Sequence, residues 1–262
     1  MSITVPVVLP DKHYLRTIKV QQGGIRALTH LALVRNASGI PHRAYVKQFP
    51  ANAPRSLFNE WFGYVFMSAL TVPQPPAAVL RAPIPGDTRM AWSFVSFEPM
   101  PRSEGTPKEI YHPASADQMK KLAERLLACH AFSTLAAADQ LCINGDRNMG
   151  NLVFTGPRSF VAIDHSDILG GCDWLEDSLL HPTAWAPAKL VDFCQSIKTL
   201  TPPQRGALAA AADVAIETLY NQWQPLRAAV AGSREACLAL DAVWWRSLDV
   251  ARWYRDRLQL LP

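Results

Sequence analysis

An Asp, an Asn and a second Asp are spaced along the middle of the chain in a way that suits phosphoryl transfer. Asp146 is followed five positions later by Asn151 and thirteen positions after that by Asp164, which closes the apolar run 160–163. In such a site the first carboxylate accepts a hydroxyl proton, while the Asn and the second Asp hold Mg²⁺ on the phosphates of ATP. The order of these residues therefore predicts nucleotide chemistry.

A polar turn is the competing interpretation of Asp146 and Asn151, because Asp and Asn often satisfy their own backbone in turns. Asp164 favours the phosphoryl-transfer site over the polar turn. A carboxylate directly after four residues of buried-strand character is costly unless it has a partner or a metal. With a short hairpin joining the three residues, we expect Asp146 to be the catalytic base and Asn151 and Asp164 to be metal ligands.

A lysine and a glutamate in the first hundred residues complete the expected site. Lys47 ends an alternating strand pattern, and Glu60 lies thirteen residues further on, in the helix that follows. Alone, each is explained as a solvated surface charge; together they suit a cation on the nucleotide phosphates, held by a helix carboxylate. Gly23 and Gly24 form either a phosphate-covering turn or a plain hairpin turn, since Gly lets backbone N–H groups approach an anion.

The first hundred residues are predicted to be β-rich. Short alternating or apolar runs between Gly, Pro and Asn turns predict strands at 17–20, 28–34, 44–49, 79–80 and 90–97. A helix is predicted over 56–70, with Ser56 as its N-cap. The prolines that follow end this helix, since proline lacks a backbone N–H group.

The remainder of the chain is predicted to be mostly helical. A β-hairpin joins 151–154 to 160–163, and helical spacing of apolar residues predicts helices over 115–135, 186–200, 203–223 and 235–260. The Pro-rich break at 98–101 is the expected boundary between a β-rich N-terminal lobe, residues 1–100, and a helical C-terminal lobe, residues 101–262. The predicted fold class is therefore a two-lobed α+β fold.

Composition restricts the function classes. Hydrophobic residues make up 49% of the chain and charged residues 18%, as in folded globular proteins. No Lys/Arg-rich run suggests direct nucleic-acid binding, and no apolar run is long enough to span a membrane. Five widely spaced cysteines and an N-terminus unlike a signal peptide lead us to expect reduced thiols and a cytoplasmic location.

Four segments together resemble the HipA-like kinases, a bacterial branch of the protein-kinase-like fold. These segments are Tyr45-Val46-Lys47, Asn59-Glu60, residues 144–152 and Ile163-Asp164-His165. The resemblance covers roughly residues 15–180. It implies that Lys47 binds ATP phosphates, that Glu60 holds Lys47, that Asp146 is the base, and that Asn151 and Asp164 bind Mg²⁺. It also implies a hinge over 94–98, where Phe97 and Glu98 would contact adenine through backbone groups.

Three positions depart from related patterns. Asn144 stands where antibiotic and small-molecule phosphotransferases of this fold usually have the His of His-Gly-Asp. Asn148 stands where the phosphoinositide-kinase-like pattern has a His after Asp-Arg. Asp164 is followed by His165 and Ser166, so the chain has no Asp-Phe-Gly.

The resemblance implies Mg·ATP-dependent phosphoryl transfer to a hydroxyl group, with a protein Ser or Thr as the favoured acceptor. A small-molecule phosphotransferase and a catalytically weak binding module of the same fold are the alternatives. Transfer of AMP in place of phosphate is also left open by the residues. The expected cofactors are ATP and Mg²⁺, and the expected partners are a protein substrate and a regulatory or antitoxin-like protein.

Overall fold

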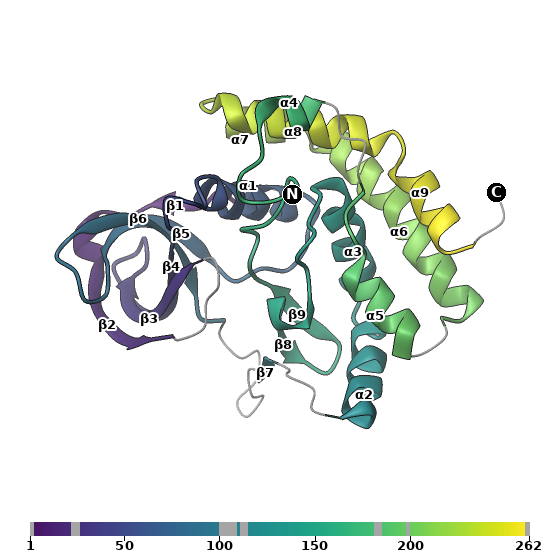
Figure 1. The fold of residues 1–262 in the computed structure, drawn as a ribbon, viewed down its shortest axis with the longest axis horizontal. Coiled ribbons are helices and arrows are strands. Elements are labelled where there is room, and N and C mark those ends of the chain that lie inside the picture. The colour runs from purple at the N-terminus through teal and green to yellow at the C-terminus, as the bar shows by residue number, and fades with distance from the viewer. Residues whose placement is uncertain are drawn as a thin grey trace.

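A curved β-sheet and a mainly helical body lie side by side in the computed structural model of the chain (Figure 1). The structure describes residues 3–21, 27–99, 109–110, 115–180, 185–197 and 200–259. The α+β class predicted from the sequence, with a β-rich first part and a helical second part, is confirmed.

The first part is built on a sheet of six strands within the described residues, in the order β1-β5-β6-β4-β3-β2. The strands are β1 (Val7–Val8), β2 (Tyr14–Val20), β3 (Leu28–Arg35), β4 (Pro41–Gln48), β5 (Ala77–Pro83) and β6 (Met90–Phe97). β1 pairs parallel with β5, and the other neighbours pair antiparallel. Alternate residues such as Val34, Val46 and Leu80 fill a small core of their own on one face of the sheet. The five predicted strands are present, and β1 is an addition.

Helix α1 (Ser56–Ala69) follows β4, close to its predicted range. The N-cap prediction for Ser56 is wrong. Arg55 already has near-helical backbone angles, φ −94° and ψ −8°, so Ser56 lies inside the first turn. Its hydroxyl is buried and makes no hydrogen bond to the residues that the structure describes, so it caps no backbone N–H group there.

The second part contains a small sheet in the order β7-β8-β9 and the remaining helices. These elements are β7 (Glu109–Ile110), α2 (Ala116–Leu127), α3 (Phe132–Leu141), the 3-10 turn η2 (Met149–Asn151), β8 (Leu152–Gly156), β9 (Ser159–Ala162), α4 (Glu176–Leu180), α5 (Lys189–Ile197), α6 (Pro202–Asn221), α7 (Trp223–Val230), α8 (Arg234–Ser247) and α9 (Val250–Arg257). β8 and β9 form the predicted hairpin, whereas β7, α4 and α7 were not expected.

The helix predicted over 115–135 is in fact two helices, α2 and α3. Leu126, near the end of α2, and Phe132, at the start of α3, are both buried. A tight turn between them brings both into the core, with the Cys129 N–H donating to Leu126 O and the Phe132 N–H donating to Cys129 O. The helix predicted over 235–260 is likewise divided, into α8 and α9.

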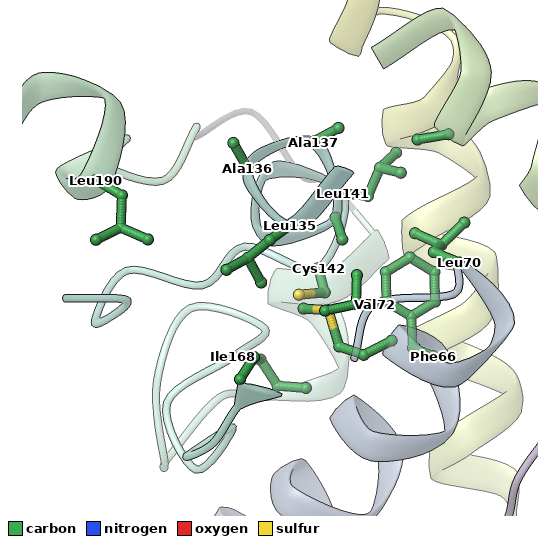
Figure 2. Packing of buried hydrophobic residues seen from close by; sticks show 14 of the residues in the cluster. Phe66, Leu70, Val72, Leu135, Ala136, Ala137, Leu141, Cys142, Ile168 and Leu190 are labelled. Carbon is green, nitrogen blue, oxygen red and sulfur yellow. The ribbon is translucent and has the colours of Figure 1, made fainter. Parts of the chain in front are cut away.

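One hydrophobic core joins α1 to the helical part, although α1 belongs to the predicted N-terminal lobe. Phe66 of α1 and Leu70, directly after it, pack with Leu135 and Leu141 of α3, and with Ile168 from the loop after β9 (Figure 2). This packing fixes α1 to the helical body, so the sequence break at 98–101 does not separate the two cores.

Two further expectations concern the whole chain. All five cysteines are free thiols, and three of them are buried. Among the described residues, no helix has the length and apolar character needed to span a membrane.

Candidate active site

Three charged side chains meet at the boundary between the two parts of the chain. Lys47 at the end of β4 places its Nζ 2.6 Å from Oε1 of Glu60 on α1 and 2.9 Å from Oδ1 of Asp164, which follows β9. The second oxygen of Glu60 accepts a hydrogen bond of 3.0 Å from the backbone N–H of His165. Glu60 therefore links the lysine to the loop that carries Asp164.

The electrostatics of this trio leave one negative charge in excess. Burial opposes the charged form of Lys47, but Glu60 and Asp164 outweigh it and raise the lysine pKa. Burial raises the pKa of Glu60, which lies only 1% exposed, against the opposing attraction of Lys47. Burial also opposes ionisation of Asp164, yet Lys47 and the Ser166 hydroxyl lower its pKa far below the usual range. Lys47 thus neutralises one of two carboxylates.

Asn59, next to Glu60 in α1, holds the loop after Asp164 in place. Its Nδ2 lies 2.9 Å from Ser166 O, 3.1 Å from Ile168 O and 2.8 Å from Gly171 O, and its Oδ1 accepts from Trp174 Nε1 at 2.9 Å. The side chain is fully buried. It satisfies backbone groups that a buried loop would otherwise leave unpaired.

A glycine allows α1 to approach this loop closely. A Cβ atom on Gly63 would lie 2.5 Å from the Cβ of His165 and 3.1 Å from Cδ1 of Ile168. The first distance is far below van der Waals contact, so a side chain at this position would push the helix and the loop apart.

Arg147 connects three segments beneath the site. Its Nε donates to both carboxylate oxygens of Asp139 on α3. Its Nη1 donates to the carbonyls of Ile163 and Asp164. Its Nη2 donates to Nδ1 of His165 at 2.9 Å. These bonds hold Asp164 in a left-handed conformation, φ 64°, which is uncommon outside glycine. Burial raises the pKa of Asp139 to about 6 against the attraction of Arg147, so the pair is ionic at neutral pH.

His165 is buried in a fixed tautomer. Because Arg147 can only donate, Nδ1 accepts and Nε2 carries the proton, which it donates to Oε1 of Gln74 at 2.9 Å. Burial and the nearby cations Arg147 and Lys47 lower the pKa of His165 well below its usual range. The ring is therefore a neutral link between the Arg147 network and Gln74.

The hairpin brings Asn151 to the same end of the small sheet as Asp164. The backbone N–H of Ile163 donates to Asn151 O at 2.9 Å, one residue before Asp164. Asn151 is almost fully buried, and its side-chain amide makes no hydrogen bond with another described residue. Mg²⁺ in nucleotide sites typically takes one or two protein oxygens and completes its shell with phosphates and waters. Asn151 and Asp164 suit that donor set.

Asp146 lies apart from the trio, at an exposed position. Its side chain is 51% exposed, and its Oδ1 lies 3.1 Å from Nζ of Lys189, the first residue of α5. Asn144 supports the loop on both sides, because its Nδ2 donates to Asp139 and its Oδ1 accepts from the Asp146 N–H. Asp146 is therefore placed where a solvent-borne hydroxyl can reach it.

A cavity of about 290 Å³ opens above Lys47, close to the lower limit for ligand sites. Lys47, Glu60 and Asp164 form its polar end. Its apolar walls come from both sheets, through Tyr45, Phe94, Val153 and Ala162, and from Pro75 and Ile163 in the adjoining loops. A flat apolar group fits between such walls, with an anionic group toward Lys47.

The predicted adenine contacts at Phe97 and Glu98 are not brought to this cavity by their side chains. Phe97 faces the core of the large sheet, and Glu98 lies 3.4 Å from Arg43. Both backbone N–H groups already donate within the first part, that of Phe97 to Pro76 O and that of Glu98 to Arg43 O. The adenine role of these two residues stays a prediction. Gly23 and Gly24 lie outside the described residues.

Several residues of the site were not singled out from the sequence. Tyr45 and Phe94 could have been found, because strand side chains alternate and Tyr45 must share the face of Lys47. Register then places Phe94 directly opposite Lys47. Gln74 and Lys189 carry no such pattern, since each reaches the site from a segment remote in sequence.

Comparison with known proteins gives matches among solved structures alone. No protein-family model matches the chain, and no curated protein matches its sequence. The chain is similar to the crystal structure of a proinflammatory kinase, CtkA, from Helicobacter pylori, with a TM-score of 0.49 and 11% sequence identity. The alignment covers 97% of this chain and 98% of that chain.

Proposed function

We propose that the chain is a HipA-like kinase that transfers the γ-phosphoryl group of Mg·ATP to a hydroxyl group, with a protein Ser or Thr as the acceptor. The observation that carries the proposal is the meeting of Lys47, Glu60 and Asp164 at the polar end of an apolar-walled cavity. The acceptor class comes from the sequence resemblance.

The residues present suit Mg·ATP in three respects. Lys47 offers a cation to the nucleotide phosphates, and Glu60 holds it in place. Asp164 and Asn151 offer oxygen ligands for a Mg²⁺ ion, which would neutralise phosphate charge when bound. Asp146 offers an exposed carboxylate to accept the proton of the attacking hydroxyl.

Nucleotide binding is tested by calorimetry with Mg·ATP. The wild-type protein should bind, and Asp164→Asn should bind at least about tenfold more weakly, because one Mg²⁺ ligand and its charge are lost. Asp117→Asn is the matched control, since Asp117 lies exposed on α2 and forms an ion pair with Lys121. No binding by the wild type would refute the proposal.

Transfer is tested with γ-labelled ATP and a cell lysate. Asp146→Asn should still bind Mg·ATP but lose roughly 10²–10⁴-fold in transfer, as expected when a general base is removed. Label in protein supports the Ser/Thr proposal, whereas label confined to small metabolites overturns that part in favour of a small-molecule phosphotransferase. The mass added to the product separates phosphoryl from AMP transfer.

A further inference from the structure

A lysine remote in sequence faces the expected base. Lys189 Nζ lies 3.1 Å from Oδ1 of Asp146, and the side chains are 42% and 51% exposed. Exposed ion pairs of this kind contribute only about 0–1 kcal/mol to folding. The ion pair therefore contributes little to stability, and the position of Lys189 next to the expected base is of more interest.

The structure holds Lys189 in place through the segment before it. The Gln140 side chain on α3 donates to the carbonyl of Ala186 at 3.1 Å. A Cβ atom on Gly145, next to Asp146, would lie 3.9 Å from Cδ of Pro187. Leu190, directly after the lysine, is buried in the main core. The start of α5 is thus docked on the loop that carries Asp146, and the lysine projects from a fixed backbone.

The charges of the site leave a role for a second cation. Lys47 is already engaged by Glu60 and Asp164 and is only 13% exposed, so it serves the inner end of the cavity. Among the described residues that line the cavity, Lys47 is the single cation. Lys189 is the cation that pairs with Asp146, the expected acceptor of the hydroxyl proton.

We propose that Lys189 is a catalytic residue that contacts the phosphoryl group during its passage to the acceptor, an inference that rests on the proposed function. In this step the bond from the γ-phosphorus to the bridging oxygen breaks, and its electron pair stays on ADP. The acceptor oxygen forms the new bond to phosphorus, and its proton passes to Asp146. Lys189 supplies positive charge to the equatorial oxygens and takes no part in the proton balance.

A transition-state mimic tests this role without knowledge of the acceptor. Calorimetry compares the binding of Mg·ADP with that of Mg·ADP plus aluminium fluoride, which imitates the planar phosphoryl group. Aluminium fluoride should tighten binding to the wild type, and Lys189→Ala should lose at least about tenfold of that gain while binding Mg·ADP normally. Lys189→Arg should retain most of the gain. Lys120→Ala, at an exposed position on α2, should behave as the wild type.

The outcomes separate this inference from the proposed function. If the wild type does not bind Mg·ADP, the proposed function fails and this inference fails with it. If it binds, but aluminium fluoride tightens Lys189→Ala as much as the wild type, only the role of Lys189 is overturned. A wild type that gains nothing from aluminium fluoride also overturns that role. In turnover, Lys189→Ala should lower kcat and leave the KM for ATP nearly unchanged.

Discussion

Asn59→Asp provides the sharpest test of how the site is held together. The substitution keeps the size and shape of the side chain and keeps an oxygen to accept from Trp174 Nε1. It removes the Nδ2 donors that bind the carbonyls of Ser166, Ile168 and Gly171, and it places a carboxylate oxygen against those carbonyls.

The expected loss follows from counting donors. Nδ2 carries two hydrogens, so its three contacts amount to about two hydrogen bonds, each contributing about 1 kcal/mol. Carbonyls left buried without a partner add about 1–3 kcal/mol to the loss. The free energy of unfolding should therefore fall by at least about 3 kcal/mol. For a chain of this size that corresponds to a fall in Tm of roughly 6–12 °C.

Thermal unfolding followed by tryptophan fluorescence measures this change, and hydrogen exchange localises it. Exchange should rise in residues 164–174, which Asn59 holds, and α6 should be little affected. Asn52→Asp is the matched control, because Asn52 is exposed and its substitution should stay within about 0.5 kcal/mol. A Tm for Asn59→Asp within 2 °C of the wild type, a margin of about half a kcal/mol, would refute the view that Asn59 anchors the loop.

Three further predictions concern the same network. Gly63→Ala should lower the free energy of unfolding by about 1–3 kcal/mol, because the new Cβ would overlap His165. This loss should exceed the gain from alanine's better helix propensity. Urea unfolding measures the change, and a variant more stable than the wild type contradicts the prediction. Arg147→Met should cost about 3–5 kcal/mol by leaving Asp139 buried without a cation. Asp139→Asn in the same protein should recover part of the loss, whereas additive effects in the double mutant would argue against the pair. Burial lowers the pKa of His30 to about 4 and that of His165 well below its usual range, so both rings bind fewer protons in the folded than in the unfolded protein. Stability should therefore fall as pH drops below about 6.5, by up to about 1.4 kcal/mol per unit for each ring, and His30→Phe should reduce that slope in unfolding at pH 7 and pH 5.

Much of the local structure was predictable from the sequence because it depends on neighbouring residues. Alternation along 44–49 and 90–97 predicts strands, since one face of each is buried, and the hairpin at 151–163 follows from two short apolar runs around a turn. The chemical types at Lys47, Glu60 and Asp164 are also local facts. Asp164 follows a buried-strand pattern, so its context already called for a partner or a metal. Lys47 and Glu60 were each explained alone as solvated charges, and only the requirements of a phosphoryl-transfer site predicted them as a pair.

Helix boundaries were less predictable because packing decides them. The division between α2 and α3 falls at a tight turn over 128–131, where the Cys129 N–H donates to Leu126 O and the Phe132 N–H donates to Cys129 O. Ser56 has the composition of an N-cap, but the backbone turns one residue earlier. In both cases tertiary contacts outweigh intrinsic preference.

The sequence by itself determined which residues can do chemistry, and the tertiary structure decided which of them meet. Lys47, Glu60 and Asp164 come together because α1 packs into the helical core and Asn59 binds the loop beyond Asp164. Lys189 reaches Asp146 across 43 positions because the start of α5 docks on α3. Such contacts depend on how whole elements pack, and periodicity along the chain carries no information about them.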